Sequence, residues 1–197
     1  LAGVDLSLEI FKQVDPGLKV NVLLHDGAEI KPKDIAFEVE GYAQSILTAE
    51  RLVLNCMQRM SGVATKTHEI VELLKGTGTH VLAPRHTPPG MRYLEKWAVK
   101  LGGGVNHRFG LFDMILIKDN HVDYSGGIKQ AIQNTKAYLQ KTGRKLAIEI
   151  EVRNLDELQQ VLDIGGIDRI LLDNFDYENL RRAVSMIGGK FETEGSG

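Results

Sequence analysis

The fold is decided by the segment Asn106-His107-Arg108-Phe109-Gly110-Leu111-Phe112-Asp113-Met114-Ile115-Leu116-Ile117-Lys118-Asp119-Asn120-His121. Its apolar run at residues 114–117 is typical of a short buried strand. A buried strand needs no charges at its ends, yet Arg108 precedes this run and Lys118 follows it. In α/β proteins the residues at the carboxyl ends of the strands usually carry the chemistry. The segment therefore predicts one strand of an α/β sheet with functional side chains beside it.

Strands and helices alternate through the rest of the chain. Gly76, Gly78 and the run Gly102–Gly104 follow helical patterns, where a left-handed backbone is expected. This alternation is typical of a parallel sheet, either doubly wound or arranged as a barrel. No dinucleotide-binding glycine motif follows a strand, and polar residues end every strand, which favours a barrel. We predict strands near residues 80–82, 114–117, 146–152, 169–172 and 190–193, and helices near 91–101, 127–140, 155–164 and 177–187.

The first part of the chain has a different pattern. We predict a helix at residues 4–14, strands near 18–24 and 35–40, and a long helix from 49 to about 74. Asp26-Gly27 supplies a turn between the two strands, and Ser61-Gly62 is a candidate for a bend in the long helix. Because a closed barrel needs more strands than the chain supplies, we expect the sequence to be part of a longer protein.

The composition is that of an ordinary globular chain of 197 residues, with 43% hydrophobic and 25% charged residues. A net charge of −2 gives no reason to expect nucleic acid or an anionic membrane as a partner. No apolar run approaches the roughly 20 residues that span a bilayer. The one cysteine, Cys56, cannot form an internal disulfide, which fits a reducing compartment. We therefore expect a cytoplasmic protein.

Positive charge is concentrated in the middle of the chain. Residues 85–121 contain six Lys or Arg residues and three acids. We assign Lys96 and the lysine one turn later to the solvated face of a predicted helix. Arg85, Arg108 and Lys118 flank strands instead, which favours a binding site for an anion.

The predicted strand at residues 146–152 carries two carboxylates. Side chains alternate along a strand, so Glu149 and Glu151 share one face and the isoleucines share the other. If helices cover the isoleucine face, both glutamates point into the barrel, where a carboxylate needs a cation or a metal ion. Arg85 and Lys118 would supply cations at the same rim. The alternative is a sheet with one solvated face.

The last two predicted strands also end in polar residues. Asp173 follows the strand at residues 169–172, where it could act as a helix cap, although Asp176 could fill that role itself. The sequence Glu194-Gly195-Ser196-Gly197 predicts a small turn after the final strand. The backbone N–H groups of such a turn can bind a phosphate.

Several short motifs occur in order along the whole chain. They are Glu50-Arg51, Leu54-Asn55, Gln58-Arg59-Met60-Ser61-Gly62, Gly102-Gly103-Gly104-Val105-Asn106-His107-Arg108, Ile117-Lys118-Asp119-Asn120-His121, Glu149-Ile150-Glu151-Val152 and Leu172-Asp173-Asn174. With this set the chain resembles the quinolinate phosphoribosyltransferase family of NAD synthesis. The resemblance implies an incomplete, open α/β barrel preceded by a small α+β sandwich domain. It assigns residues 1–48 to the C-terminal part of the sandwich domain and residues 49–197 to a barrel truncated at its C-terminal end.

The resemblance also implies a homodimer and a reaction. The family transfers phosphoribosyl from phosphoribosyl pyrophosphate to quinolinate with decarboxylation, giving nicotinate mononucleotide, CO2 and pyrophosphate, with Mg²⁺ as cofactor. Matching motifs make Lys118, Glu151 and Asp173 the expected catalytic residues, with both acids near Mg²⁺. The residues expected to bind substrate are Arg51 (from the partner subunit), Arg85, His86, His107, Arg108, Ser196 and Gly197.

One motif departs from the family pattern. The family usually has Asp-Thr-Arg-Lys-Thr-Thr-Pro-Gly, and this chain has Ala83-Pro84-Arg85-His86-Thr87-Pro88-Pro89-Gly90. His86 replaces a lysine and is mostly neutral near pH 7, and Pro84 has no N–H group. Losing one fixed charge against an anionic substrate costs about 2–4 kcal/mol in the transition state. Two alternatives therefore stay open: a catalytically impaired relative or fragment that acts as a dimerising scaffold, and an aldolase-like barrel in which Lys118 forms a Schiff base.

Overall fold

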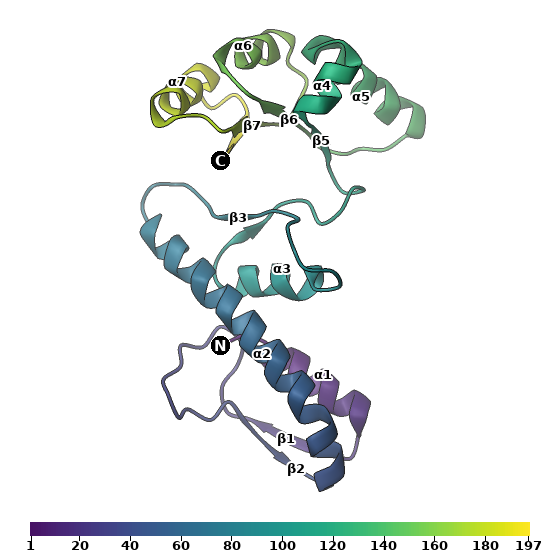
Figure 1. Cartoon of the computed structure of the whole chain (residues 1–197), viewed down its shortest axis with the longest axis vertical. Coiled ribbons are helices and arrows are strands. Elements are labelled where there is room, and N and C mark those ends of the chain that lie inside the picture. Colours follow the sequence, from purple (N-terminus) through teal and green to yellow (C-terminus); the bar gives the residue numbers. More distant parts are fainter. The chain divides into compact units, whose positions relative to one another are not determined.

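The longest element is the helix α2 (Ala43–Leu73), which has 31 residues in the computed structural model of the chain, covering residues 1–197 (Figure 1). It begins before the predicted start at residue 49 and continues without interruption through Ser61. The Ser61 hydroxyl accepts a hydrogen bond from the Ala2 N–H at 2.9 Å and donates one to the Ala2 carbonyl at 3.1 Å. Ser61 therefore anchors the amino terminus to α2, and the helix is not interrupted there.

The first half of α2 packs against α1 (Val4–Val14) and a β-hairpin. In the hairpin β1 (Lys19–Val22) pairs antiparallel with β2 (Phe37–Glu40), so the predicted strands are confirmed with shorter bounds. Side chains on these strands alternate between partly buried and exposed, which gives the sheet one apolar face. The apolar cluster beneath it contains Phe11, Leu18, Val20, Phe37, Ala49 and Val53.

The second half of α2 packs against α3 (Arg92–Leu101). Gly102, at the end of α3, lies so close to α2 that a Cβ atom would collide with the carbonyl oxygen of Ala64. This close approach requires glycine. Beside α3 the strands β3 (Leu82–Ala83) and β4 (Val105–Asn106) form a parallel pair. The strand β4 was not predicted, because two residues after a glycine run give no periodic pattern.

The chain divides into two units, Leu1–Phe109 and Gly110–Gly197. The first unit includes α3 because α2 packs on both α1 and α3. The predicted domain boundary between residues 48 and 49 stays a prediction. None of the helices combines the length and the apolar composition that crossing a bilayer would require.

The second unit is a parallel sheet with helices on one face (Figure 1). Neighbouring strands are consecutive in the sequence, as in an α/β barrel and unlike a doubly wound sheet. The α/β class is therefore confirmed, and closure into a barrel stays a prediction. Three of the four helices in this unit were predicted, and the first helix, at residues 119–125, was not. The strands are β5 (Ile115–Ile117), β6 (Ile148–Val152), β7 (Arg169–Asp173) and β8 (Glu192–Ser196), and the helices are α4 (Asp119–Ser125), α5 (Ile128–Thr142), α6 (Leu155–Ile164) and α7 (Tyr177–Ile187).

The isoleucine face of this sheet forms the core of the second unit. Its strand residues pack against apolar side chains of the covering helices. Burial of each such side chain stabilises the fold by about 1.5–3 kcal/mol. Because the helices cover this face, the polar side chains of the strands are left on the other face. The completely buried members are Ile132, Ile150, Val152, Leu158, Val161, Ile170, Leu172 and Ala183.

Candidate active site

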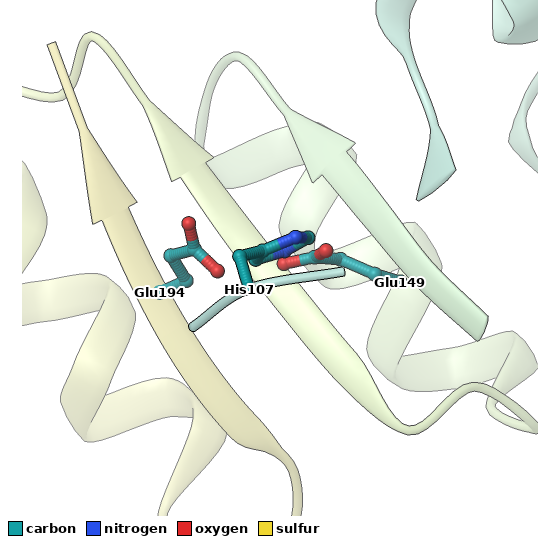
Figure 2. Close-up of side chains that lie close together, drawn as sticks. All are labelled: His107, Glu149 and Glu194. Atoms are coloured by element: carbon teal, nitrogen blue, oxygen red, sulfur yellow. The ribbon is translucent and has the colours of Figure 1, made fainter. Parts of the chain in front are cut away.

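Carboxylates line the face of the four-stranded sheet that the helices leave uncovered. The strand β6 places Glu149 and Glu151 on this face, as predicted, and Ile150 in the core. Figure 2 shows Glu149 and Glu194 extending from β6 and β8 toward the same side of the sheet. A carboxylate oxygen of Glu149 lies within 4.8 Å of one of Glu194. Two carboxyl groups from different strands therefore approach each other on this face, where negative charge needs a nearby cation.

Arg169 offsets this charge near the amino-terminal ends of the strands. Its Nε donates a hydrogen bond to Glu192 Oε2 at 2.9 Å, and its Nη1 lies 3.6 Å from Glu194 Oε2. The strand register also places Arg169 opposite Glu149. These contacts join β6, β7 and β8 near their amino-terminal ends. The side chains at the carboxyl ends of the strands make no contact with Arg169 among these bonds.

Lys118 and Glu151 meet at the carboxyl end of the sheet. Lys118 follows β5, and its Nζ lies 3.7 Å from Glu151 Oε2. The Lys118 side chain is 51% exposed and that of Glu151 is 8% exposed, so the carboxylate is the less hydrated partner. Burial raises the pKa of Glu151, the Lys118 ammonium opposes this rise, and the nearby Asp173 carboxylate adds to it. The pair gives one buried acid and one accessible cation.

Asp173 is fixed by two neighbouring side chains at the end of β7. Ser196 Oγ donates to Asp173 Oδ1 at 2.6 Å, and Asn174 Nδ2 donates to Asp173 Oδ2 at 2.7 Å. Asp176 caps α7 by accepting a hydrogen bond from the Asn179 N–H at 2.8 Å. The capping alternative for Asp173 is therefore wrong, because Asp176 fills that role.

Ser196 belongs to β8 itself. The strand was predicted to end near residue 193 but extends to Ser196, so the predicted Gly-Ser-Gly turn at residues 195–197 is wrong. The strand register places Ser196 beside Asp173. The next residue, Gly197, has a φ of 141°, and a Cβ atom there would lie 3.0 Å from the Asn174 Cα. Glycine therefore fits this position better than any larger residue.

His121 has a structural role at the start of α4 that was not predicted. Its Nδ1 accepts a hydrogen bond from the Lys118 N–H at 3.0 Å, three residues earlier, at the start of α4. This is the geometry of a capping box, with His121 in place of the usual Glu or Gln. The separation of three residues between Lys118 and His121 could have indicated this contact from the sequence. The contact fixes the backbone that carries Lys118.

In the first unit, two loops follow the parallel strands β3 and β4. Parallel pairing puts the residues after both strands at the same end, with Arg85 and His86 in one loop and His107 and Arg108 in the other. His86 is exposed. Arg85 Nε and Thr87 Oγ1 are buried and have no hydrogen-bond partner in the protein. Such groups suit the oxygen atoms of an anionic ligand.

Lys96 connects these two loops, and its prediction as a solvated residue is wrong. It was assigned to a solvated helix face, but it is only 4% exposed. Its Nζ donates to the carbonyl oxygens of Ala83 at 2.9 Å and His107 at 3.0 Å. The helical pattern gave no sign of this, since Lys96 lies off the apolar stripe that faces α2. Its burial comes from the strand ends, which periodicity along the helix does not reveal.

Arg51 lies on α2, far in the sequence from the two loops that follow β3 and β4. It is exposed. Leu47 and Leu54 lie four residues before and three residues after it, on the same face of the helix, and are 68% and 39% exposed. An exposed face that combines apolar groups with an arginine is typical of a contact surface.

Comparison with known proteins shows the family. The family model described as "Quinolinate phosphoribosyl transferase, C-terminal domain" matches residues 63–197, and the N-terminal domain model of the same family matches residues 1–61. The chain belongs to the quinolinate phosphoribosyltransferase family. The resemblance drawn from the sequence motifs is thereby confirmed.

Individual members of the quinolinate phosphoribosyltransferase family match the whole chain. The mitochondrial decarboxylating quinolinate phosphoribosyltransferase 2b of Nicotiana tabacum is 42% identical, covering 100% of this chain and 60% of the relative. The chloroplastic nicotinate-nucleotide pyrophosphorylase of Arabidopsis thaliana gives the same three values. The chain thus spans about 60% of the length of the curated relatives it matches. Because these names include two organelles, the cytoplasmic location stays a prediction.

Solved structures of the family share the fold. NadC from Streptococcus pyogenes has a TM-score of 0.93 and 35% identity, covering 100% of this chain and 68% of that structure. The nicotinate-nucleotide pyrophosphorylase from Francisella tularensis has a TM-score of 0.93 and 41% identity, covering 100% and 69%. Agreement over the full length of the chain supports the fold class predicted from the sequence.

Proposed function

We propose that this phosphoribosyltransferase family member transfers phosphoribosyl from phosphoribosyl pyrophosphate to the ring nitrogen of quinolinate, with loss of one carboxylate as CO2. The observation that carries this proposal is the set of Lys118, Glu151, Asp173 and Ser196 at the carboxyl ends of β5 to β8. One cation, two carboxylates and a hydroxyl suit a charged sugar phosphate. The names of the relatives support the same reaction.

Quinolinate carries two carboxylates on adjacent ring carbons, and the loops of the first unit offer donors for them. Arg85 and Arg108 can bind carboxylates through paired N–H groups. The buried Arg85 Nε and Thr87 Oγ1 atoms support this assignment, because a ligand oxygen would complete their hydrogen bonding. His107 adds a ring whose Nδ1 accepts the Arg108 N–H at 2.8 Å. His86 stands in this group where the family pattern has a lysine.

The sheet residues of the second unit would act on the ribose. When the bond between the anomeric carbon and pyrophosphate breaks, the electron pair leaves with pyrophosphate and positive charge develops on the ribose. The Glu151 and Asp173 carboxylates can stabilise that charge, and the Lys118 ammonium can stabilise the leaving pyrophosphate. The pyridine nitrogen then supplies the electron pair of the new bond. Ser196 would hold Asp173 in place, and it would bind the 5′-phosphate together with Gly197.

Glu151 and Asp173 also fit a magnesium ion. Carboxylate oxygens are the protein ligands that Mg²⁺ prefers, and substrate phosphates usually complete its coordination. When bound, Mg²⁺ would neutralise charge on the pyrophosphate. The hydrogen bonds from Asn174 and Ser196 would hold the Asp173 carboxylate in a fixed orientation toward such an ion.

We propose further that Arg51 serves a second copy of the chain. Its face of α2 exposes Leu47 and Leu54, which supports an interface there. A homodimer would let Arg51 bind quinolinate in the partner's site. Two identical chains would then each complete the other's site.

The proposed reaction is tested by incubating the full chain with quinolinate, phosphoribosyl pyrophosphate and Mg²⁺. Nicotinate mononucleotide is expected to appear together with equal amounts of CO2 and pyrophosphate. Lys118→Met is expected to abolish this product. Absence of both product formation and substrate binding in the wild-type chain would favour the second candidate described next.

The second candidate is a catalytically impaired relative that acts as a dimerising scaffold. The departure that favours it is in the Arg85 loop, where His86 replaces a fixed charge and Pro84 lacks an N–H group. Titration calorimetry separates the candidates, because a scaffold is expected to bind neither quinolinate nor phosphoribosyl pyrophosphate. Binding of either substrate at micromolar affinity argues for the enzyme.

A further inference from the structure

One buried lysine joins the ends of both strands in the first unit. Lys96 Nζ donates to the Ala83 carbonyl at 2.9 Å and to the His107 carbonyl at 3.0 Å. Ala83 is the last residue of β3, and His107 directly follows β4. The two carbonyls thus belong to different strands, and a single ammonium fixes the distance between them.

Neighbouring hydrogen bonds strengthen this connection. The His107 N–H donates to the same Ala83 carbonyl at 3.2 Å. Asn106 Nδ2 donates to the backbone carbonyl of Lys96 at 2.9 Å, which ties the helix to β4 from the other direction. One turn earlier on α3, Arg92 Nη1 donates to the Phe109 carbonyl at 3.3 Å. The helix α3 is therefore attached to both loops, and Lys96 is placed at their junction.

We propose that Lys96 is a positioning residue of the quinolinate site, which sets the spacing between Arg85 in one loop and His107-Arg108 in the other. This inference rests on the proposed function. Quinolinate holds its two carboxylates at a fixed separation, so the groups that bind them must also be held apart by a fixed distance. Lys96 can act without contacting the substrate, since two of its donors are directed at backbone carbonyls.

The chemistry of lysine suits this role. An ammonium group has three N–H donors, and two of them already bind carbonyls from different strands. An apolar side chain of similar length would fill the space but would leave both carbonyls without this donor. The loops could then separate without unfolding the helix, whose contact with α2 is made by other residues, including Ala98.

The test compares three variants of the full chain. Lys96→Met removes the donors and keeps the side-chain length. Lys96→Arg keeps the charge and several donors, so it is expected to rescue part of the effect. Lys100→Met is the matched control, because Lys100 is exposed on the same helix one turn later.

Two readouts are needed. Calorimetry is expected to show that Lys96→Met weakens quinolinate binding by about tenfold, as the loss of one well-placed hydrogen-bonded contact does. Its affinity for phosphoribosyl pyrophosphate is expected to stay within about twofold, because Lys118 and Glu151 lie in the other unit. Hydrogen exchange is expected to increase in residues 84–90 and 105–109 and to remain unchanged in α2. Lys100→Met is expected to match the wild type in all of these measurements.

Each other outcome contradicts the inference. Unchanged exchange in both loops of Lys96→Met would show that Lys96 does not position them. Increased exchange throughout the first unit, with both substrates weakened equally, would show a general structural role. If Lys96→Met does not fold, Lys96→Gln, which offers fewer donors, takes its place under the same criteria. If the wild-type chain binds no quinolinate, the proposed function fails, and the exchange data still decide whether Lys96 positions the loops.

Discussion

Replacing Glu151 by Gln is expected to move activity and stability in opposite directions. Glu151 lies on the polar face of the sheet, with its side chain 8% exposed and its Oε2 3.7 Å from Lys118 Nζ. At this distance, two unit charges attract by about 1 kcal/mol with the dielectric constant of water and by about 4 kcal/mol with the effective constant of a protein surface. Because the Lys118 side chain is 51% exposed, solvent screening weakens this attraction. Desolvation of a buried carboxylate costs several kcal/mol, so the ionised Glu151 destabilises the fold.

The pH dependence follows from the raised pKa of Glu151. The folded chain binds this proton more tightly than the unfolded chain does. The stabilising contribution is therefore complete below the ordinary Glu pKa of 4.5 and is lost as the pH rises through the raised pKa. Gln does not titrate and avoids this loss. At pH 7 the free energy of unfolding of Glu151→Gln is expected to equal or exceed that of the wild type.

Catalysis is expected to respond in the opposite way, because a neutral amide cannot stabilise the charge that develops on the ribose. Loss of one such group typically lowers kcat by about 10²- to 10³-fold. Urea unfolding between pH 4 and 8 and initial rates of product formation provide the two measurements. Glu178→Gln, at an exposed position on α7, is the control. A variant that loses stability along with activity would refute this account of Glu151.

Three further predictions address other parts of the site. Ser196→Ala removes the 2.6 Å hydrogen bond to Asp173 and is expected to lower kcat about tenfold. Ser185→Ala is the control and is expected to leave kcat unchanged, because its hydroxyl is bonded within α7. Equal rates for both variants would contradict the role of Ser196. His86→Lys restores a fixed charge beside Arg85 and is expected to raise kcat/KM for quinolinate at least about tenfold at pH 8, and an unchanged value would remove His86 from the site. Mixing inactive Arg51→Ala and Lys118→Ala chains is expected to recover about a quarter of wild-type activity, because about half of the dimers would contain both variants and each of these would have one intact site out of two. If no activity is recovered, the site is not shared between two chains.

The elements with strong periodic patterns could be predicted from the sequence. The helix α1 and the helices α6 and α7 have the predicted bounds, because an apolar stripe and clear end signals define each of them. The short elements β4 and α4 were missed. Two strand residues or two helical turns carry too little pattern, and tertiary contacts such as that of Gly102 with α2 decide their structure.

The site could be predicted only in part, for a similar reason. Alternation along β6 was enough to place both glutamates on the face opposite the core. The contact between Lys118 and Glu151 follows from parallel strands that end at the same edge. Lys96 could not be recognised, because its partners are backbone carbonyls far from it in the sequence. A backbone carbonyl is present at every residue and leaves no signal in side-chain patterns.

The most direct test of the central claim is a crystal structure of the chain with phosphoribosyl pyrophosphate and Mg²⁺. The claim predicts the ribose and pyrophosphate at the carboxyl ends of β5 to β8, within hydrogen-bonding distance of Lys118, Asp173 and Ser196, and with Glu151 near the anomeric carbon. Binding of the sugar phosphate on any other surface, with these four side chains left in contact only with solvent, would contradict it.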